Sequence, residues 1–218
     1  MKKRTISATA IFHYACSAVF LIFAYAASQE PRIMTTVRAM YTTKTSLETR
    51  FDLHIYWKVR EKEETQSGMI FLAPGDKFRV ELGSTIWVCN GETYWQSDKD
   101  DKGTQVVIKR LADVNVTMHP SHVLNTYVAK YVYRLKEETG SAAIVEWTAD
   151  SLAGQTEATV IRMSIDKKSG KILSLFIIDK SGNETAYTFK KVKFPAKLPE
   201  KTFEYTPPKG ASILDMRN

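Results

Sequence analysis

Apolar and polar positions alternate strictly over residues 47–59, and this pattern predicts one unusually long β-strand. Every odd-numbered position except Thr49 is apolar, whereas charged residues, a histidine and a tyrosine occupy the even-numbered positions. Period-2 alternation gives a strand one apolar and one polar face. Residues 47–59 at about 3.3 Å each would span roughly 43 Å, so the strand requires a large sheet.

A helix is predicted ahead of this strand, over residues 31–44. Its apolar residues fall three or four positions apart in a single stripe, and Pro31 suits a first helical turn. The stripe either packs on the sheet as core or covers the mouth of a cavity. The periodicity alone favours packing as core.

Shorter alternating segments predict further strands, separated by Pro-Gly, Asn-Gly and Ser-Gly turns. They lie at residues 65–73, 77–82, 85–89, 93–96, 104–109, 142–148, 157–166, 171–179 and 184–194, with another near Tyr131 and a last edge at 203–205. The alternation fails over residues 110–125, where Pro120 precedes a short predicted helix. Since an antiparallel sheet of about eleven strands must curl, split or close, we expect a strongly curved sheet with a helix inside.

Residues 1–26 have the features of a secretory signal peptide. Three basic residues open the segment, an apolar run follows, and it ends in the small-x-small tripeptide Ala-Tyr-Ala. We expect cleavage after Ala26, and a single domain over residues 27–218 because no linker or change of composition divides them. The alternatives are an uncleaved membrane anchor and a lipid-modified Cys16, although the residues before Cys16 match a lipoprotein cleavage site poorly.

Composition and charge add few constraints. The 218 residues are 44% hydrophobic and 25% charged, as in an ordinary soluble protein. Loss of residues 1–26 lowers the formal net charge from +7 to +4, because these residues hold three basic side chains and no acidic one. This excess of positive charge is compatible with binding to anionic lipid or to an acidic partner, and equally with an ordinary soluble surface. No array of basic and aromatic residues indicates nucleic-acid binding.

Candidate catalytic and metal-binding residues are few. His119 and His122 are three positions apart but lack a third ligand, and the acidic loop at residues 98–103 lacks EF-hand spacing. His54 lies on the polar side of the long strand without a nearby nucleophile. No nucleophile elbow, phosphate loop or HExxH motif occurs. We therefore predict neither an enzyme nor a bound cofactor or metal.

Several segments resemble the periplasmic outer-membrane lipoprotein carrier family (LolA). They follow the family's order: residues 68–81 (GMIFLAPGDKFRVE), 89–95 (CNGETYW), 165–172 (IDKKSGKI), 179–183 (DKSGN), 203–210 (FEYTPPKG) and 215–217 (DMR). One departure concerns the lid, because some family members carry an Arg that helps hold it shut where this chain has Ala73. Arg79 lies a few residues further on.

The resemblance implies a mainly β fold, an unclosed barrel of about eleven antiparallel strands with helices as a lid over an apolar cavity. It also implies a monomeric periplasmic carrier that receives the acyl chains of lipoproteins from an inner-membrane ABC transporter and passes them to an outer-membrane acceptor. The alternatives are a sensor domain of similar fold that binds lipid or an envelope protein, and a lipid-processing enzyme that uses one of the histidines.

Alternation and the resemblance together predict an apolar ligand site. The sheet positions expected to line it are Phe51, Leu53, Ile55, Trp57, Leu72, Phe78, Val80, Leu82, Trp87, Trp95 and Met163. The lid is expected to consist of Met34, Val37, Met40 and Tyr41 from the first helix, with Val123 and Leu124 from the middle one. These side chains either enclose a hydrophobic ligand or simply fill the interior.

Overall fold

The computed structural model describes residues 30–42, 46–114, 127–128, 131–148 and 158–217. The predicted signal peptide lies outside these residues, as does the predicted middle helix with Val123, Leu124, His119 and His122. Within the described ranges, no helix is both long and apolar enough to cross a bilayer.

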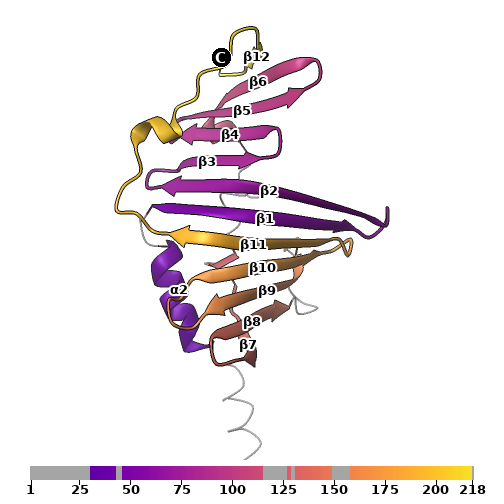
Figure 1. Cartoon of the computed structure of the whole chain (residues 1–218), viewed down its shortest axis with the longest axis vertical. Helices are drawn as coiled ribbons and strands as arrows, with labels where there is room; N and C mark the ends of the chain where they lie inside the picture. Colours follow the sequence, from indigo (N-terminus) through magenta and orange to yellow (C-terminus); the bar gives the residue numbers. More distant parts are fainter. Residues whose placement is uncertain (1–29, 43–45, 115–126, 129–130, 149–157, 218) are drawn as a thin grey trace, which may run out of the picture.

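One α-helix, two short 3-10 helices and twelve strands make up the described part of the chain (Figure 1). They are α2 (Arg32–Thr42), β1 (Leu47–Trp57), β2 (Lys62–Ala73), β3 (Lys77–Leu82), β4 (Thr85–Asn90), β5 (Thr93–Asp100), β6 (Gly103–Arg110), η1 (Leu111–Asp113), β7 (Arg134–Glu138), β8 (Ala142–Thr148), β9 (Ala158–Asp166), β10 (Ile172–Asp179), β11 (Glu184–Lys193), η3 (Glu200–Phe203) and β12 (Ser212–Asp215).

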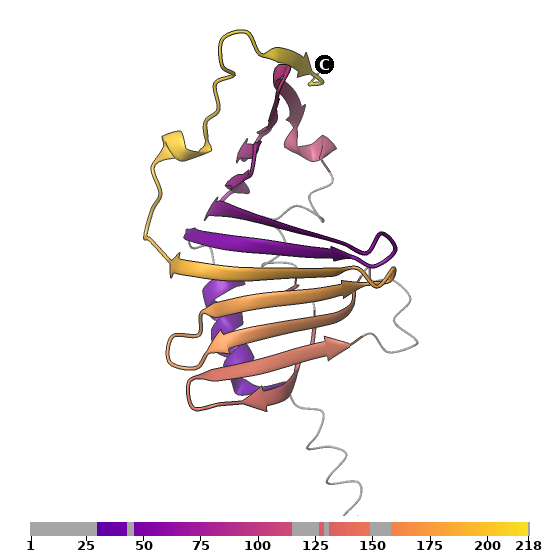
Figure 2. The same ribbon diagram turned by 45° about the vertical axis from the view of Figure 1, so that its right-hand side comes forward.

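All twelve strands belong to one sheet, in the order β12-β6-β5-β4-β3-β2-β1-β11-β10-β9-β8-β7. Neighbouring strands are antiparallel except for β12, which runs parallel to β6. The sheet is unclosed because β12 and β7 lie at opposite edges. Figure 2 shows that β3–β6 turn out of the plane of β7–β11, so one face is concave, and α2 packs on it. The predicted mainly β, curved and unclosed sheet is confirmed, with one more strand than expected.

The long strand predicted over residues 47–59 is two residues too long. β1 ends at Trp57, where the backbone N–H of Arg60 donates to the Trp57 carbonyl oxygen at 3.1 Å. Glu61 then takes a positive φ of 49°, which closes a four-residue turn before β2. Val59 therefore lies in this turn, with 85% of its surface exposed.

The acidic loop predicted at residues 98–103 is mostly strand. β5 continues to Asp100 and β6 begins at Gly103, because the Asp100 carboxylate accepts the backbone N–H groups of Lys102 and Gly103 at 2.8 and 3.0 Å. Asp98 accepts a hydrogen bond from the Thr85 hydroxyl at 2.7 Å. Among the residues that the structure describes, no group of three or more His, Cys, Asp or Glu side chains is placed to hold a metal ion.

The edge strand predicted at residues 203–205 is wrong. Phe203 ends η3 and is buried where η3 contacts β3 and β4, and the Tyr205 hydroxyl donates to Ser97 Oγ at 2.7 Å. These contacts hold the segment against the sheet without strand pairing. The last strand is instead β12, which follows the consecutive prolines at positions 207 and 208.

Candidate functional site

One row of apolar side chains crosses the concave face through five neighbouring strands. The register pairs Val145 of β8 with Met163 of β9, Met163 with Leu175 of β10, Leu175 with Tyr187 of β11, and Tyr187 with Leu53 of β1. All five side chains are buried and belong to the same cluster. Directly paired residues share a face, so the row is a continuous apolar surface. We call this cluster the concave cluster.

A glycine extends the concave cluster from β1 onto β2. Gly68 pairs with the fully buried Phe51, and a Cβ atom at Gly68 would lie 2.7 Å from Phe51 Cζ and 2.4 Å from the Glu81 carbonyl oxygen. No other residue fits there without a shift of the backbone or the ring. The Phe51 ring therefore lies over the backbone of β2, and it also contacts Tyr187, with the ring centroids 5.8 Å apart.

The predicted apolar stripe of α2 packs on the concave cluster. Met34 and Val37 are completely buried, and Tyr41 is 7% exposed. The Tyr41 hydroxyl accepts the backbone N–H of Ile172 at 3.0 Å, and its ring packs edge-to-face on Phe194 at 5.2 Å. Burial raises the pKa of Tyr41 to about 12 despite the Ile172 hydrogen bond, so the side chain stays neutral among its apolar neighbours.

The turn between β9 and β10 supports α2 from the side. Gly170 has a positive φ of 69°, which suits glycine. A Cβ atom there would lie 2.9 Å from Thr36 Cγ2 and 3.0 Å from Met40 Sδ. Helix and turn are therefore in direct contact, and Gly170 is the residue that permits their close approach.

Most of the predicted site residues come together in the structure. The concave cluster includes the buried side chains Met34, Val37, Tyr41, Phe51, Leu53, Val80, Leu82 and Met163, with Met40, Ile55, Leu72 and Trp87 packed against it. Phe78 is buried in an adjoining cluster with Cys89 and Tyr94. Trp57 lies at the end of β1 and is 36% exposed. The role of these residues in ligand binding remains a prediction.

The prediction that Trp95 lines the concave face is wrong. Val80 pairs with Trp87, and Trp87 pairs with Gln96. Gln96 therefore shares the face of Trp87, whereas Trp95, its neighbour in the strand, points to the convex face. The reason is the two-residue loop between β4 and β5, across which odd positions on one strand face even positions on the next.

Neither sequence candidate for lid control reaches α2. Arg79 pairs with Phe71 and Val88 on the convex face, and its Nε donates to Glu81 Oε1 at 2.6 Å. Ala73 ends β2 and has no side chain that could form a hydrogen bond. The arginine that ties α2 to another segment is Arg38.

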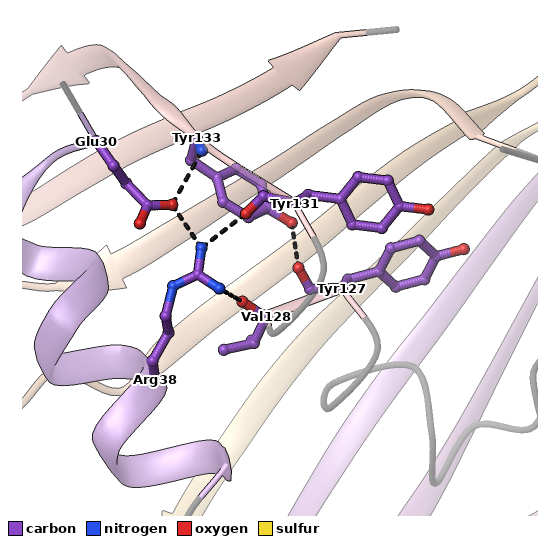
Figure 3. Close-up of polar contacts among 6 residues, drawn as sticks. All are labelled: Glu30, Arg38, Tyr127, Val128, Tyr131 and Tyr133. Carbon is purple, nitrogen blue, oxygen red and sulfur yellow. Dashed lines mark hydrogen bonds and ion pairs between the residues drawn. The ribbon is translucent and has the colours of Figure 1, made fainter. Parts of the chain in front are cut away.

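Arg38 of α2 ties the helix to the segment that leads into β7 (Figure 3). Its Nη1 donates to the Val128 carbonyl oxygen at 2.6 Å, and its Nη2 donates to the Tyr131 carbonyl oxygen at 2.7 Å and to Glu30 Oε1 at 2.5 Å. Glu30 also accepts the backbone N–H of Tyr133 at 3.1 Å. We call these four hydrogen bonds the Arg38 clasp.

Aromatic side chains anchor the clasped segment to the sheet. The Tyr133 hydroxyl donates to the Tyr127 carbonyl oxygen at 2.6 Å, and burial raises the Tyr133 pKa. Tyr131 lies between Tyr127 and Trp147 of β8, with ring centroids 5.8 and 4.4 Å away. The clasp therefore connects α2 to β8 through a chain of aromatic contacts. The strand predicted near Tyr131 begins only at Arg134, and the three tyrosines before it belong to the concave cluster or pack against it.

The sequence analysis missed the role of Arg38 and Glu30. For Arg38 a signal existed, because it follows Met34 by four positions and therefore lies on the side of the helix that carries the apolar stripe, whereas Glu30 precedes α2. Two of the partners of Arg38 are backbone carbonyl groups about ninety residues away in sequence, and side-chain patterns do not identify backbone acceptors.

Arg38→Met is expected to weaken the clasp and lower the free energy of unfolding by about 2 kcal/mol, because it leaves two carbonyl groups and Glu30 without their charged donor. The matched control is Arg32→Met, since Arg32 is exposed on the same helix. Urea denaturation and amide hydrogen exchange over residues 30–42 measure both effects. Equal unfolding midpoints and exchange rates for the two variants would contradict a structural role of the clasp.

Among the described residues the only histidine is His54. His54 lies on the convex face of β1, where its Nε2 is 3.4 Å from Glu63 Oε2. It therefore does not reach the concave cluster. His119 and His122 lie outside the described residues.

Comparison with known proteins places this geometry in a family. A family model described as "Outer membrane lipoprotein carrier protein LolA" matches residues 43–206. Proteins named outer-membrane lipoprotein carrier protein from Chromobacterium violaceum and Neisseria meningitidis are similar to the chain. The first is 28% identical over 70% of this chain and 74% of its own length, and the second 29% identical over 72% and 76%.

A solved structure supports the fold alone. An uncharacterised conserved protein from Thermus thermophilus superposes with a TM-score of 0.53 at 16% identity, over 84% of this chain and 96% of that protein. The family match spans well over half of the chain and includes every strand from β1 to β11. The chain therefore belongs to the LolA family.

Proposed function

We propose that this protein is a periplasmic carrier that binds the acyl chains of lipoproteins on its concave face and takes them from the inner to the outer membrane. One observation carries the proposal: a buried apolar surface runs across the concave side of the sheet, and the helix α2 packs on it. Membership of the LolA family and the names of its relatives support it.

The energetics suit a carrier. Burial of acyl CH₂ groups stabilises by about 0.8 kcal/mol each, so a chain of about sixteen carbons represents roughly 12 kcal/mol. A lipoprotein cannot cross water with such a chain exposed. The concave cluster offers apolar contacts from five or more strands, and the side chains of Met34, Val37 and Tyr41 occupy that surface when no cargo is bound.

Binding requires an exchange of contacts. Acyl chains reach the sheet only where the apolar stripe of α2 leaves it, so cargo favours the open position of the helix and its absence favours the closed one. The Arg38 clasp opposes opening. Part of the free energy gained by burying the acyl chains is therefore spent on displacing α2. The net binding free energy is smaller than the burial term alone, so the cargo can still be released.

The remaining parts of the proposal concern transport. Residues 1–26 would be removed on export, and residues 27–218 would act as a single, monomeric domain. The donor would be an inner-membrane ABC transporter that releases lipoproteins, and the recipient an acceptor at the outer membrane. No catalytic step is needed, because the cargo changes partners without a covalent change.

A release assay tests the proposed function. Inner-membrane vesicles with the cognate transporter and a labelled lipoprotein are incubated with the exported protein, with and without ATP. We expect the label to enter the soluble fraction in complex with the protein, in the ATP-containing sample alone. If the natively folded protein solubilises no more label than vesicles alone, the carrier proposal fails and the sensor alternative takes its place. Sequencing of the purified protein's N-terminus shows whether residues 1–26 are removed.

A further inference from the structure

One buried hydroxyl group on the concave face, that of Tyr187, forms no hydrogen bond with the described part of the chain. The buried tyrosines within the described ranges are Tyr41, Tyr94, Tyr133 and Tyr187, with 7, 5, 0 and 7% of their surface exposed. The hydroxyl groups of the other three form hydrogen bonds with groups of this chain, at 3.0, 3.2 and 2.6 Å. Because buried polar groups are almost always paired, the Tyr187 hydroxyl requires an explanation.

The Tyr187 side chain is held in place by the apolar side chains of the concave cluster. It pairs with Leu53 of β1 and Leu175 of β10. Its ring centroid lies 5.8 Å from that of Phe51 and 6.1 Å from that of Phe189. Side chains of a strand stand roughly perpendicular to the sheet, so the hydroxyl group is the part of Tyr187 farthest from β11. It therefore points away from the sheet in an orientation fixed by packing.

Packing alone does not require this hydroxyl group. A phenylalanine has the same ring and would avoid the burial of a donor without an acceptor, which destabilises a fold. Burial raises the pKa of Tyr187 to about 12, with a smaller contribution from Tyr127, so the group keeps its proton. It is the only side-chain hydrogen-bond donor among the five residues of the apolar row.

We propose that the Tyr187 hydroxyl donates a hydrogen bond to the carbonyl oxygen of an acyl ester when cargo occupies the concave face. The acceptor must be neutral, because a charged group would be buried among apolar side chains. It must also be joined to an apolar chain, since Leu53 and Leu175 flank Tyr187. Acyl chains linked to glycerol through esters meet both conditions, and they are the cargo of the proposed carrier, on which this assignment rests.

The hydrogen bond distinguishes cargo from the helix that it replaces. The stripe of α2 on the concave cluster, with Met34 and Val37 at its centre, is apolar. An ester that takes its place supplies the acceptor that Tyr187 lacks. The hydroxyl group therefore stabilises the loaded state alone, and it selects acyl esters over ethers and plain alkyl chains.

Two synthetic lipopeptides that differ only in their linkage test the proposal. Both carry the same pair of chains on a glyceryl group at an N-terminal cysteine, joined by esters in one and by ethers, which lack the carbonyl oxygen, in the other. Displacement of an apolar fluorescent dye from the purified protein measures both affinities. The ratio of ester affinity to ether affinity should fall about tenfold from the wild type to Tyr187→Phe, as expected for loss of one hydrogen bond.

Thermal unfolding of the empty protein separates this role from a structural one. Tyr187→Phe should leave the unfolding midpoint unchanged or raise it. The matched control, Tyr133→Phe, should lower the midpoint, because the Tyr133 hydroxyl donates to the Tyr127 carbonyl oxygen at 2.6 Å. If Tyr187→Phe is destabilised like Tyr133→Phe and keeps the wild-type ratio of affinities, the hydroxyl serves the fold through a buried water and the proposal is wrong.

Phosphatidylglycerol with the same chains, in ester and ether forms, identifies the source of the ester. A preference that depends on Tyr187 supports the assignment with either pair of ligands, and the pair that shows it distinguishes lipoprotein from membrane lipid. If the wild type and Tyr187→Phe bind the lipopeptides with the same ratio of affinities, the assignment alone fails and the carrier proposal stands. If the wild type binds neither lipopeptide, the carrier proposal fails and the assignment fails with it.

Discussion

Leu53→Glu is expected to lower the free energy of unfolding by about 4 kcal/mol, the largest loss that we expect from a single substitution in this chain. Leu53 is 6% exposed and lies at the β1 end of the apolar row, paired with Tyr187 on one side and Gln66 on the other. A carboxylate there has no basic partner within the row. The protein must either bury a charge or keep the carboxyl group protonated, and both are costly.

Val59→Glu is the matched control, because it introduces the same side chain in the same hairpin at a position that is 85% exposed. Its effect on stability should stay within about 0.5 kcal/mol. Urea denaturation of both variants at neutral pH makes the comparison. Equal midpoints would show that Leu53 does not belong to a buried face, and the assignment of the concave side would have to be abandoned.

Periodicity predicted most of the sheet because each strand with one buried face shows its alternation locally. The pattern over residues 47–57 and the repeated short hairpins after residue 157 both correspond to observed strands. The apolar stripe of α2 was predicted for the same reason. In each case the relevant neighbours lie within a few positions along the chain.

The face of the sheet on which each side chain lies was harder to predict than the strands themselves, because it depends on the lengths of the loops between strands. Trp87 and Trp95 are both odd-numbered and both lie in strands, yet the two-residue loop between β4 and β5 places them on opposite sides. Phe78 and Trp87 differ in parity and share a side, because the loop between β3 and β4 also has two residues. An error of one residue in a loop inverts the assignment of a whole strand.

Contacts between distant segments could not be predicted at all. Two of the partners of Arg38 are carbonyl groups about ninety positions away, and Phe203 packs on strands that lie more than one hundred positions earlier. Neither arrangement leaves a periodic trace in the sequence. For that reason the resemblance to the family directed attention to Ala73 and Arg79, whereas the arginine that ties α2 to another segment is Arg38.

The account as a whole depends on movement of α2, and a disulfide between the helix and the β9–β10 turn would prevent that movement. Thr36 and Gly170 suit the purpose, because the Cβ position at Gly170 lies 3.8 Å from Thr36 Cβ, about the mean Cβ separation of about 3.8 Å in disulfides. A cysteine at Gly170 is strained by the positive φ of 69°, at a cost of about 1 kcal/mol or more. The strain is present in both redox states, so the reduced protein is the control.

The decisive measurement is the release of labelled lipoprotein from inner-membrane vesicles by the variant with Thr36→Cys and Gly170→Cys, oxidised and then reduced. We expect the oxidised protein, with α2 fixed on the concave cluster, to leave the label in the membrane. Reduction should restore its release into the soluble fraction. If the oxidised protein, with the disulfide confirmed by mass spectrometry, solubilises as much lipoprotein as the reduced one, the cargo does not replace α2 on the concave face and the account is wrong.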